Sequence, residues 1–295
     1  MSQSSIYSSR IKRALAYIEA HLDEKILLDE LAAHAHFSSF HFHRIFTAYV
    51  DETVGDYIQR KKLETASRQL AYTDKKVATV AYELGYSSLS TFSRAFKKQF
   101  DCTPSYYRKH GLPEKSKIRK TLPDIPHYLA DSKEVFAVQV KQLAFRKLAY
   151  ISVRNSFEAG KSLRALQQLI AWSKDAGIYE QGTLMGMSAD DVLVTPKSKY
   201  RYLVAISLPD DFQLEHSQIE LMVLRSRQYA CLKVSGPIEK VIGAYNFLFR
   251  SWLLNSDFEP CNSPAMEIFL NKQNATDWSN FELELALPVQ PLIHY

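Results

Sequence analysis

The sequence predicts a multidomain protein, with an all-α N-terminal domain followed by an α+β C-terminal domain. In the first, two helix-turn-helix units are joined by a linker helix; the second consists of duplicated strand-helix-strand-strand units. Three observations predict this. A segment with a helical pattern occurs twice, about 50 residues apart, and a charged stretch with three prolines follows it, from Gly111 to Lys133. Beyond it, two runs of strand and helix patterns close alike, with Leu203-Val-Ala-Ile-Ser-Leu-Pro209 and Leu283-Glu-Leu-Ala-Leu-Pro288.

The helical repeat is the most informative of the three. Its copies read Phe37-Ser-Ser-Phe-His-Phe-His-Arg-Ile-Phe46 and Tyr86-Ser-Ser-Leu-Ser-Thr-Phe-Ser-Arg-Ala-Phe96. Each has an aromatic residue and two serines, then an arginine one turn into an amphipathic helix. Counted from that arginine, the matching positions are Arg44, Phe46, Asp51, Thr53 and Tyr57 in the first copy and Arg94, Phe96, Asp101, Thr103 and Tyr107 in the second. Two such units joined by one helix can bind two similar targets a fixed distance apart, and double-stranded DNA offers such targets.

Hydrophobic periodicity and end signals place the helices of the N-terminal part. Ile11, Leu15, Ile18 and Leu22 have helical spacing, and Ser38 or Ser39 is suited to begin the third helix. The further helices are expected at Leu27–Ala35, Val54–Ala71, Val77–Leu84, Ser88–Phe100 and Ser105–Lys109, with Gly85 in the turn before Ser88.

The C-terminal part is expected to alternate strands and helices in two similar halves, which would form two curved sheets around a pseudo-two-fold groove. The first half has strands at Val135–Val140, Lys147–Val153, Leu184–Met187 and Tyr200–Ser207 and a helix at Lys161–Asp175. The second has strands at Glu220–Leu224, Gln228–Val234, Ala265–Phe269 and Phe281–Leu287 and a helix at Ile238–Asn255.

Charge separates the two parts. Residues 1–120 hold 20 Lys and Arg against 13 Asp and Glu, a balance of +7, whereas the remainder holds 17 against 19, a balance of −2. The basic part is therefore the candidate for binding a polyanion. No apolar run approaches the roughly 18 residues of a membrane helix. The N-terminus has no apolar core region behind a basic start, so we expect no export. The three cysteines are far apart, so we expect no disulfide framework and a reduced, cytoplasmic location without membrane association.

The repeated helix has a face suited to reading DNA. In the first copy Phe42, Ile45 and Phe46 form the apolar stripe, so the residues on the opposite side point outward, namely Phe40, His43 and Arg44. An outward arginine is by itself most simply a solvated charge, but its repetition favours recognition of guanine in the major groove. The predicted DNA-binding residues are Ser39, Phe40, His43 and Arg44 in the first copy and Ser88, Leu89, Ser90, Ser93, Arg94, Lys97 and Lys98 in the second. We hypothesise that the first copy carries more sequence information, since the second has mainly small hydroxyl residues beside its arginine.

The helix between the copies suits this geometry. A helix of roughly 18 residues is about 27 Å long, which can hold two recognition helices near the roughly 34 Å repeat of the major groove. Phosphate contacts position a protein on DNA without specifying sequence. Candidates for them are Lys61, Lys62, Arg68, Lys75, Lys76, Lys97, Lys98, Arg108 and Lys109.

At these residues the chain resembles the AraC/XylS family of bacterial transcription regulators. The resemblance covers residues 5–110 and rests on Gly85-Tyr-Ser-Ser-Leu-Ser-Thr-Phe-Ser-Arg-Ala-Phe-Lys-Lys-Gln-Phe100 and on Tyr57-Ile-Gln-Arg-Lys-Lys-Leu-Glu-Thr-Ala66, which looks like the family's linker helix. It implies two recognition helices in successive major grooves, with DNA and RNA polymerase as partners. Asp101 stands where the family usually has glycine, and aspartate tolerates a left-handed backbone if one is needed there.

Residues 111–133 are expected to be a linker, and residues 134–292 resemble the GyrI-like effector-binding domain. That resemblance rests on Ser235-Gly-Pro237, Trp252 and Pro264-Ala-Met-Glu-Ile-Phe269. It implies a small ligand, amphipathic or cationic in class. Glu284 matches the acidic position that such domains use against cations, although it could face solvent beside Glu282. The remaining predicted effector-binding residues are aromatic: Trp172, Tyr202, Tyr245, Trp252 and Phe269.

Other functions remain open at this point. The C-terminal part could bind a protein partner instead of a small ligand, or a hydrolase activity could reside there. No Ser/His/Asp or Cys/His set and no glycine-rich phosphate loop favours catalysis, so we expect no enzyme and no cofactor. His34, His36, His41 and His43 are close in sequence, but two of them lie at i, i+2 and point to different helix faces. We therefore expect no metal site.

Overall fold

The computed structural model describes residues 3–122, 135–144, 146–192, 194–212, 219–261, 263–277 and 279–292. The chain divides into two compact units, residues 1–120 and 121–295, and each is described by itself. The predicted linker, residues 111–133, falls partly within the described residues. Its first part contains a short 3-10 helix, η1 (Lys117–Thr121), and residues 123–134 lie outside the described part.

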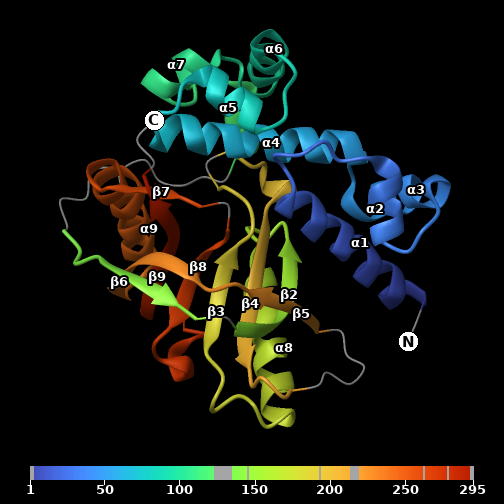
Figure 1. The fold of residues 1–295 in the computed structure, drawn as a ribbon. Coiled ribbons are helices and arrows are strands. Elements are labelled where there is room, and N and C mark those ends of the chain that lie inside the picture. The colour runs from blue at the N-terminus through green and yellow to red at the C-terminus, as the bar shows by residue number, and fades with distance from the viewer. Residues whose placement is uncertain are drawn as a thin grey trace. The chain divides into compact units, whose positions relative to one another are not determined.

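The first unit is helical, as predicted (Figure 1). Its helices are α1 (Gln3–Ala20), α2 (Leu28–His34), α3 (Ser39–Val50), α4 (Val54–Tyr72), α5 (Val77–Glu83), α6 (Leu89–Phe100) and α7 (Pro104–His110). Most predicted boundaries are within two residues of these, because each helix carries its own apolar stripe and its own end signals.

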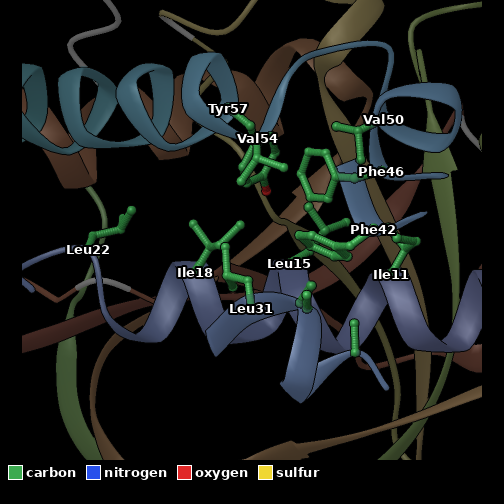
Figure 2. Close-up of a cluster of buried hydrophobic side chains, with 13 residues drawn as sticks. Ile11, Leu15, Ile18, Leu22, Leu31, Phe42, Phe46, Val50, Val54 and Tyr57 are labelled. Atoms are coloured by element: carbon green, nitrogen blue, oxygen red, sulfur yellow. The ribbon is translucent and has the colours of Figure 1, made fainter. Parts of the chain in front are cut away.

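The first half of this unit is built around one apolar cluster from α1, α2, α3 and α4. Figure 2 shows Ile18, Leu31, Phe42, Phe46 and Tyr57 pointing toward one another. Phe46 meets Tyr57 edge to face, with ring centroids 5.8 Å apart and planes at 77°. Burial of these side chains orients α3, because only one face of that helix is apolar.

The second half repeats this packing in detail. Phe96 meets Tyr107 edge to face at 5.5 Å and 79°. Phe92 and Phe96 lie 5.6 Å apart, and the equivalent pair, Phe42 and Phe46, also lies 5.6 Å apart. The sequence repeat is therefore a repeat of the tertiary core.

The turns within the two copies share one geometry but use different residues. Gly85 has φ 71° and closes the turn between α5 and α6, as its position predicts. Its counterpart between α2 and α3 is His36, with φ 53°. In both turns the next amide reaches back to a helix carbonyl, Phe37 N to Ala32 O and Tyr86 N to Ala81 O, which is the pattern of a Schellman cap.

The second unit contains a continuous antiparallel sheet. Its strands are β1 (Gln139–Leu143), β2 (Arg146–Arg154), β3 (Leu184–Ser188), β4 (Arg201–Leu208), β5 (Glu220–Leu224), β6 (Arg227–Gly236), β7 (Phe258–Pro260), β8 (Ala265–Phe269) and β9 (Phe281–Pro291). The helices are α8 (Lys161–Asp175) and α9 (Ile238–Phe247), and a π-helix (Leu248–Trp252) and a 3-10 helix (Leu253–Asn255) continue α9. The first strand begins later than expected, at Gln139 rather than Val135, and the last one extends further, to Pro291.

The expectation of two separate curved sheets is wrong, because the two halves share one sheet. The strand order is β1-β6-β9-β8-β3-β4-β2-β5, with β7 paired to β9. At its centre β3 of the first half pairs with β8 of the second, from Met185↔Ile268 to Ser188↔Ala265. Each half also lends its first strand to the other, since β1 pairs with β6 and β5 pairs with β2. Backbone hydrogen bonds therefore run across the junction of the duplicated units.

The sheet curls, and its two faces differ. Only two residues connect β1 to β2, and only two connect β5 to β6, although each pair lies far apart in the strand order. Because such a link spans about 10 Å, the two ends of the sheet must approach each other.

One face is covered by α8 over β2 and β4 and by α9 over β6 and β9; we call it the helix-covered face. The opposite, inner face encloses Met185, Met187, Tyr229, Cys231, Met266 and Ala286.

Within the described residues, no helix combines the length and the apolar character that are needed to cross a membrane.

Candidate functional site

The third helix presents a polar face opposite its buried one. Phe42 and Phe46 on α3 are fully buried, whereas His43 and Arg44 are exposed. Among the described residues, Arg44 has no hydrogen-bond or ion-pair partner. Phe40 lies in the first turn of α3, and its side chain is outside what the structure describes. The predicted outward orientation is therefore seen for His43 and Arg44.

The sixth helix repeats this arrangement. Phe92, Phe96 and Phe100 are buried on one side of α6. The predicted residues exposed on this helix are Leu89, Ser90, Arg94, Lys97 and Lys98, while Ser93 is half-buried. The two arginines therefore occupy equivalent exposed positions on equivalent helices.

Two of the predicted serines are occupied within the protein. Ser39 donates a hydrogen bond to Asp29 on α2. Ser88 is the N-cap of α6, and its hydroxyl accepts a hydrogen bond from Thr91 N at 3.2 Å. A capping side chain satisfies an amide that the helix leaves free, so the first role of Ser88 is to set where α6 begins, whereas Ser39 ties the first turn of α3 to α2.

Several candidate phosphate contacts are already engaged. Lys61 Nζ lies 3.6 Å from Glu64 Oε2, and Lys75 pairs with Glu83 at 3.0 Å. Lys62 donates to the Glu24 carbonyl at 3.3 Å, and burial lowers its pKa. The further engaged side chains are Arg68, with Thr65, and Arg108, with the Lys75 carbonyl. Lys76, Lys97, Lys98 and Lys109 remain exposed.

A buried ion-pair network holds the start of α4 against the loop after α3. Arg60 donates to both oxygens of Glu52, at 2.9 to 3.2 Å, and to Glu64 Oε1 at 2.8 Å. Tyr57 donates to Glu19 Oε1 at 2.6 Å, which joins α4 to α1. These bonds fix the direction in which the linker helix leaves the first recognition unit.

The structure brings only some of the predicted effector-binding residues together, and Glu284 is not among them. Glu284 pairs with Ile268 across β8 and β9, so it projects from the inner face. There Lys141 donates to it at 2.5 Å. Trp172 packs on the helix-covered side against Phe212. Trp252 stacks on Phe258, with ring centroids 5.9 Å apart.

Tyr202 and Tyr245 do converge, and they meet at a different carboxylate, that of Glu267. The Tyr202 hydroxyl donates to Glu267 Oε2, and the Tyr245 hydroxyl donates to Oε1 at 3.3 Å. Phe269 is two residues further along β8 and shares this face. Gly186 lies opposite Glu267 on β3. The cluster thus draws side chains from both halves of the duplicated unit.

The absent side chain of Gly186 makes this arrangement possible. A Cβ added there would lie 1.7 Å from Tyr202 Oη and 3.0 Å from Glu267 Oε2. Such contacts are far inside van der Waals distance, so any other residue at this position would displace Tyr202.

The cluster is desolvated although Glu267 is itself partly exposed. Burial raises the pKa of Glu267, against the two tyrosine hydrogen bonds, which lower it. Burial and then the neighbouring carboxylate raise the pKa of Tyr202 and of Tyr245 well above the usual value. The site therefore holds one carboxylate whose charge is poorly solvated and two hydroxyls that remain protonated. Such a group attracts a cation with an apolar body.

Sequence reasoning missed Glu267. The available signal was a single acidic residue inside the apolar strand Ala265-Met-Glu-Ile-Phe269. Glu284 gives the same kind of signal in Leu283-Glu-Leu285. Only the strand register shows that Glu267 and not Glu284 shares a face with the tyrosines.

Comparisons with known proteins agree with both parts of the fold. Residues 31–110 match the helix-turn-helix domain model, and residues 136–290 match the model of the GyrI-like small molecule binding domain. Regulatory protein SoxS of Escherichia coli (strain K12) is 38% identical over 98 residues, which is 33% of this chain and 92% of that protein.

Two further matches also cover about a third of the chain. The transcriptional regulator Rob of Salmonella typhimurium is 36% identical over 99 residues, 34% of each chain. The solved DNA-binding domain of AdpA in complex with a target DNA is 26% identical, with 34% of this chain and 91% of that one covered and a TM-score of 0.33.

The GyrI-like match spans more than half of the chain, and the helical match spans both α3 and α6. The resemblance stated from the sequence is thereby confirmed. The chain belongs to the family of transcription regulators that join an AraC-type helix-turn-helix domain to a GyrI-like small molecule binding domain.

Proposed function

We propose that the chain recognises a bipartite operator through α3 and α6, each placed in one of two successive major grooves. The supporting observation is the pair of equivalent exposed arginines, Arg44 and Arg94, on helices with matching aromatic cores. The longer of the two helices between them, α4, has 19 residues and is therefore about 28 Å long, which suits grooves that repeat at roughly 34 Å. Arginine is suited to pair with guanine through two hydrogen bonds.

The experiment is selection of binding sites from random DNA with the full chain, followed by insertion of base pairs between the two selected half-sites. Because α4 is a rigid spacer, five inserted base pairs should abolish bipartite binding by moving one half-site to the opposite side of the duplex. Ten inserted base pairs separate the grooves by another turn and should also fail. Binding that tolerates either insertion would sink the two-groove proposal.

We further propose that the cluster of Glu267, Tyr202 and Tyr245 binds an amphipathic cation, and that this binding changes DNA affinity. The desolvated carboxylate and the tyrosines from both halves support this class of ligand. A direct test uses tetraphenylphosphonium as cation and triphenylphosphine oxide as neutral control, with binding followed by calorimetry. Glu267→Gln should lose affinity for the cation only.

Glu284→Gln is the matched control, since Glu284 lies on the inner face and is paired with Lys141. Retained affinity in Glu284→Gln together with lost affinity in Glu267→Gln supports the tyrosine cluster. The reverse result would assign the ligand to the inner face. If neither cation nor neutral compound binds, the alternative that this domain meets a protein partner gains support. We also propose that the chain contacts RNA polymerase, as its family resemblance implies.

A further inference from the structure

The exposed face of α6 continues to the very end of the helix. Ser90, Arg94 and Asp101 lie at i, i+4 and i+11, which places them on one stripe, and all three are exposed. In the last turn Lys97, at i+7, lies on this stripe and Lys98 lies beside it, and both are also exposed. The stripe therefore runs from the predicted base contacts toward the C-terminal end of the helix.

Asp101 ties a downstream segment to that end. It ends α6 in the left-handed conformation, with φ 59°, and its Oδ2 accepts a hydrogen bond from the Lys117 amide at 2.7 Å. Arg119 closes the intervening turn by donating to the carbonyls of Leu112 and Pro113, at 2.7 and 3.0 Å. Residues 112–120, which we call the basic strap, thus form an ordered part of the first unit.

The basic strap offers positive charge to a partner. Lys115, Lys117 and Lys120 are exposed, and their ammonium groups have no partner among the described residues. The strap contains one acidic residue, Glu114. Since Arg119 is used internally, the three lysines are the groups that can bind an anion outside the protein.

We propose that the basic strap is an additional DNA-binding surface, which contacts the phosphate backbone at the C-terminal edge of the groove occupied by α6. The proposal rests on the proposed placement of α6 in the major groove. That groove is about 12 Å wide, whereas a helix of 12 residues is about 18 Å long. The end of α6 therefore reaches the groove wall, where the phosphates are. A carboxylate on this stripe would repel them, unless it serves to hold cations there.

The first copy supplies an internal comparison. Asp51 ends α3 in the same left-handed conformation, with φ 61°, at the position equivalent to Asp101. It is exposed, and its carboxylate has no partner in the described part of the chain. Replacement of either aspartate by glycine removes one negative charge and relieves the same backbone conformation. Only the change at Asp101 also releases the basic strap.

The test is the salt dependence of DNA binding by the full chain on the selected operator, measured by fluorescence anisotropy. In the triple variant Lys115→Gln, Lys117→Gln, Lys120→Gln, the slope of log K against log[salt] should decrease in size by about 0.9 for each phosphate that the variant no longer neutralises. Base preference should not change, because phosphate contacts carry no direct sequence information. Asp101→Gly should weaken binding, whereas Asp51→Gly should leave it unchanged or strengthen it.

Folding is a minor concern, since the three lysines are exposed and glycine readily adopts a left-handed conformation. An unchanged salt slope in the triple variant overturns the proposal whatever Asp101→Gly does. The proposal is also overturned if Asp101→Gly binds DNA more tightly than the wild type does, by the same factor as Asp51→Gly. If the wild-type chain selects no DNA at all, the proposed function itself fails. If the wild-type chain binds DNA and Arg44→Ala weakens that binding, the proposed function holds. If the wild type and the triple lysine variant then have equal salt slopes, only the role of the basic strap is overturned.

Discussion

The Tyr202 hydroxyl reaches across Gly186 and donates a hydrogen bond to Glu267, so that three adjacent strands, β4, β3 and β8, meet at one carboxylate. Tyr202 belongs to the first half of the duplicated unit, and Glu267 belongs to the second. The bond therefore crosses the junction between the halves. A cation that binds Glu267 must compete with Tyr202 for the carboxylate, which links occupancy of the site to the packing of both halves.

Stability should depend on pH through Glu267. Burial raises its native pKa above the usual 4.5. At a pH between 4.5 and this raised pKa, the folded state therefore binds more protons than the unfolded state does. Stability contributed by this group therefore falls as pH rises through that window. Glu267→Gln has no such loss, and its stability relative to the wild type should rise over the same window and then stay constant. Urea unfolding of both proteins from pH 4.5 to 8 checks this, and a pH-independent difference contradicts it.

Gly186→Ala should destabilise the second unit by about 1–3 kcal/mol, the usual range for overpacking. The added Cβ would lie 1.7 Å from Tyr202 Oη and 2.6 Å from its Cζ. In a Tyr202→Ala background the same change should cost much less, because the clashing ring is gone. Gly55→Ala is a control, since nothing lies within 4 Å of a Cβ at that position. Additive effects of Gly186→Ala and Tyr202→Ala in thermal unfolding would refute the clash.

The two recognition helices should contribute unequally to base preference. Arg44→Ala should cost about 1–3 kcal/mol at one base position and relax selection there. Around Arg94 the neighbouring residues are mainly small hydroxyls, of which Ser88 is used as a cap and Ser93 is half-buried. We therefore expect the second helix to contact mainly the DNA backbone, so that Arg94→Ala weakens binding more evenly across sequences. Binding to a library with every operator position randomised measures both effects. A greater loss of preference from Arg94→Ala than from Arg44→Ala refutes the hypothesis.

The Glu52–Arg60 pair should matter for stability mainly when it is broken on one side. Glu52→Leu removes one of the two carboxylates that pair with the buried Arg60 guanidinium, and a loss of about 3 kcal/mol is expected for an ion pair broken in this way. The double variant Glu52→Leu, Arg60→Met removes both charges and should be the more stable of the two. Chemical unfolding of the three proteins decides this, and a double variant less stable than Glu52→Leu would show that the pair itself is strongly stabilising.

Much of the helical unit could be predicted because its signals are local. The apolar stripe of each helix, the position of Gly85 and the tolerance of Asp101 for a left-handed backbone all follow from neighbouring residues. The structure agrees at each point, with φ 71° at Gly85 and 59° at Asp101. The exposure of Arg44 and Arg94 follows as well, because burial of Phe42 and Phe92 leaves the arginines only the outer face.

The C-terminal unit was predicted less completely because sheets are assembled from distant segments. The strands were placed mainly from their patterns, but the pairing of β3 with β8 and the exchange of β1 and β5 carry no local signal. Glu267 and Glu284 look alike in sequence, and register alone separates them. Lys61 likewise reads as a surface cation, yet Glu64 lies beside it.

By itself, the sequence determined that two equivalent helical units, each with an outward arginine, are joined by one helix, and that a second, separately duplicated domain follows. These are properties of periodicity and repetition, which need no knowledge of distant contacts. Only the tertiary structure decided which carboxylate meets the tyrosines and that Asp101 holds the basic strap. Both depend on residues that are brought together across strands or turns, where the chain's path and not its local pattern sets the distance.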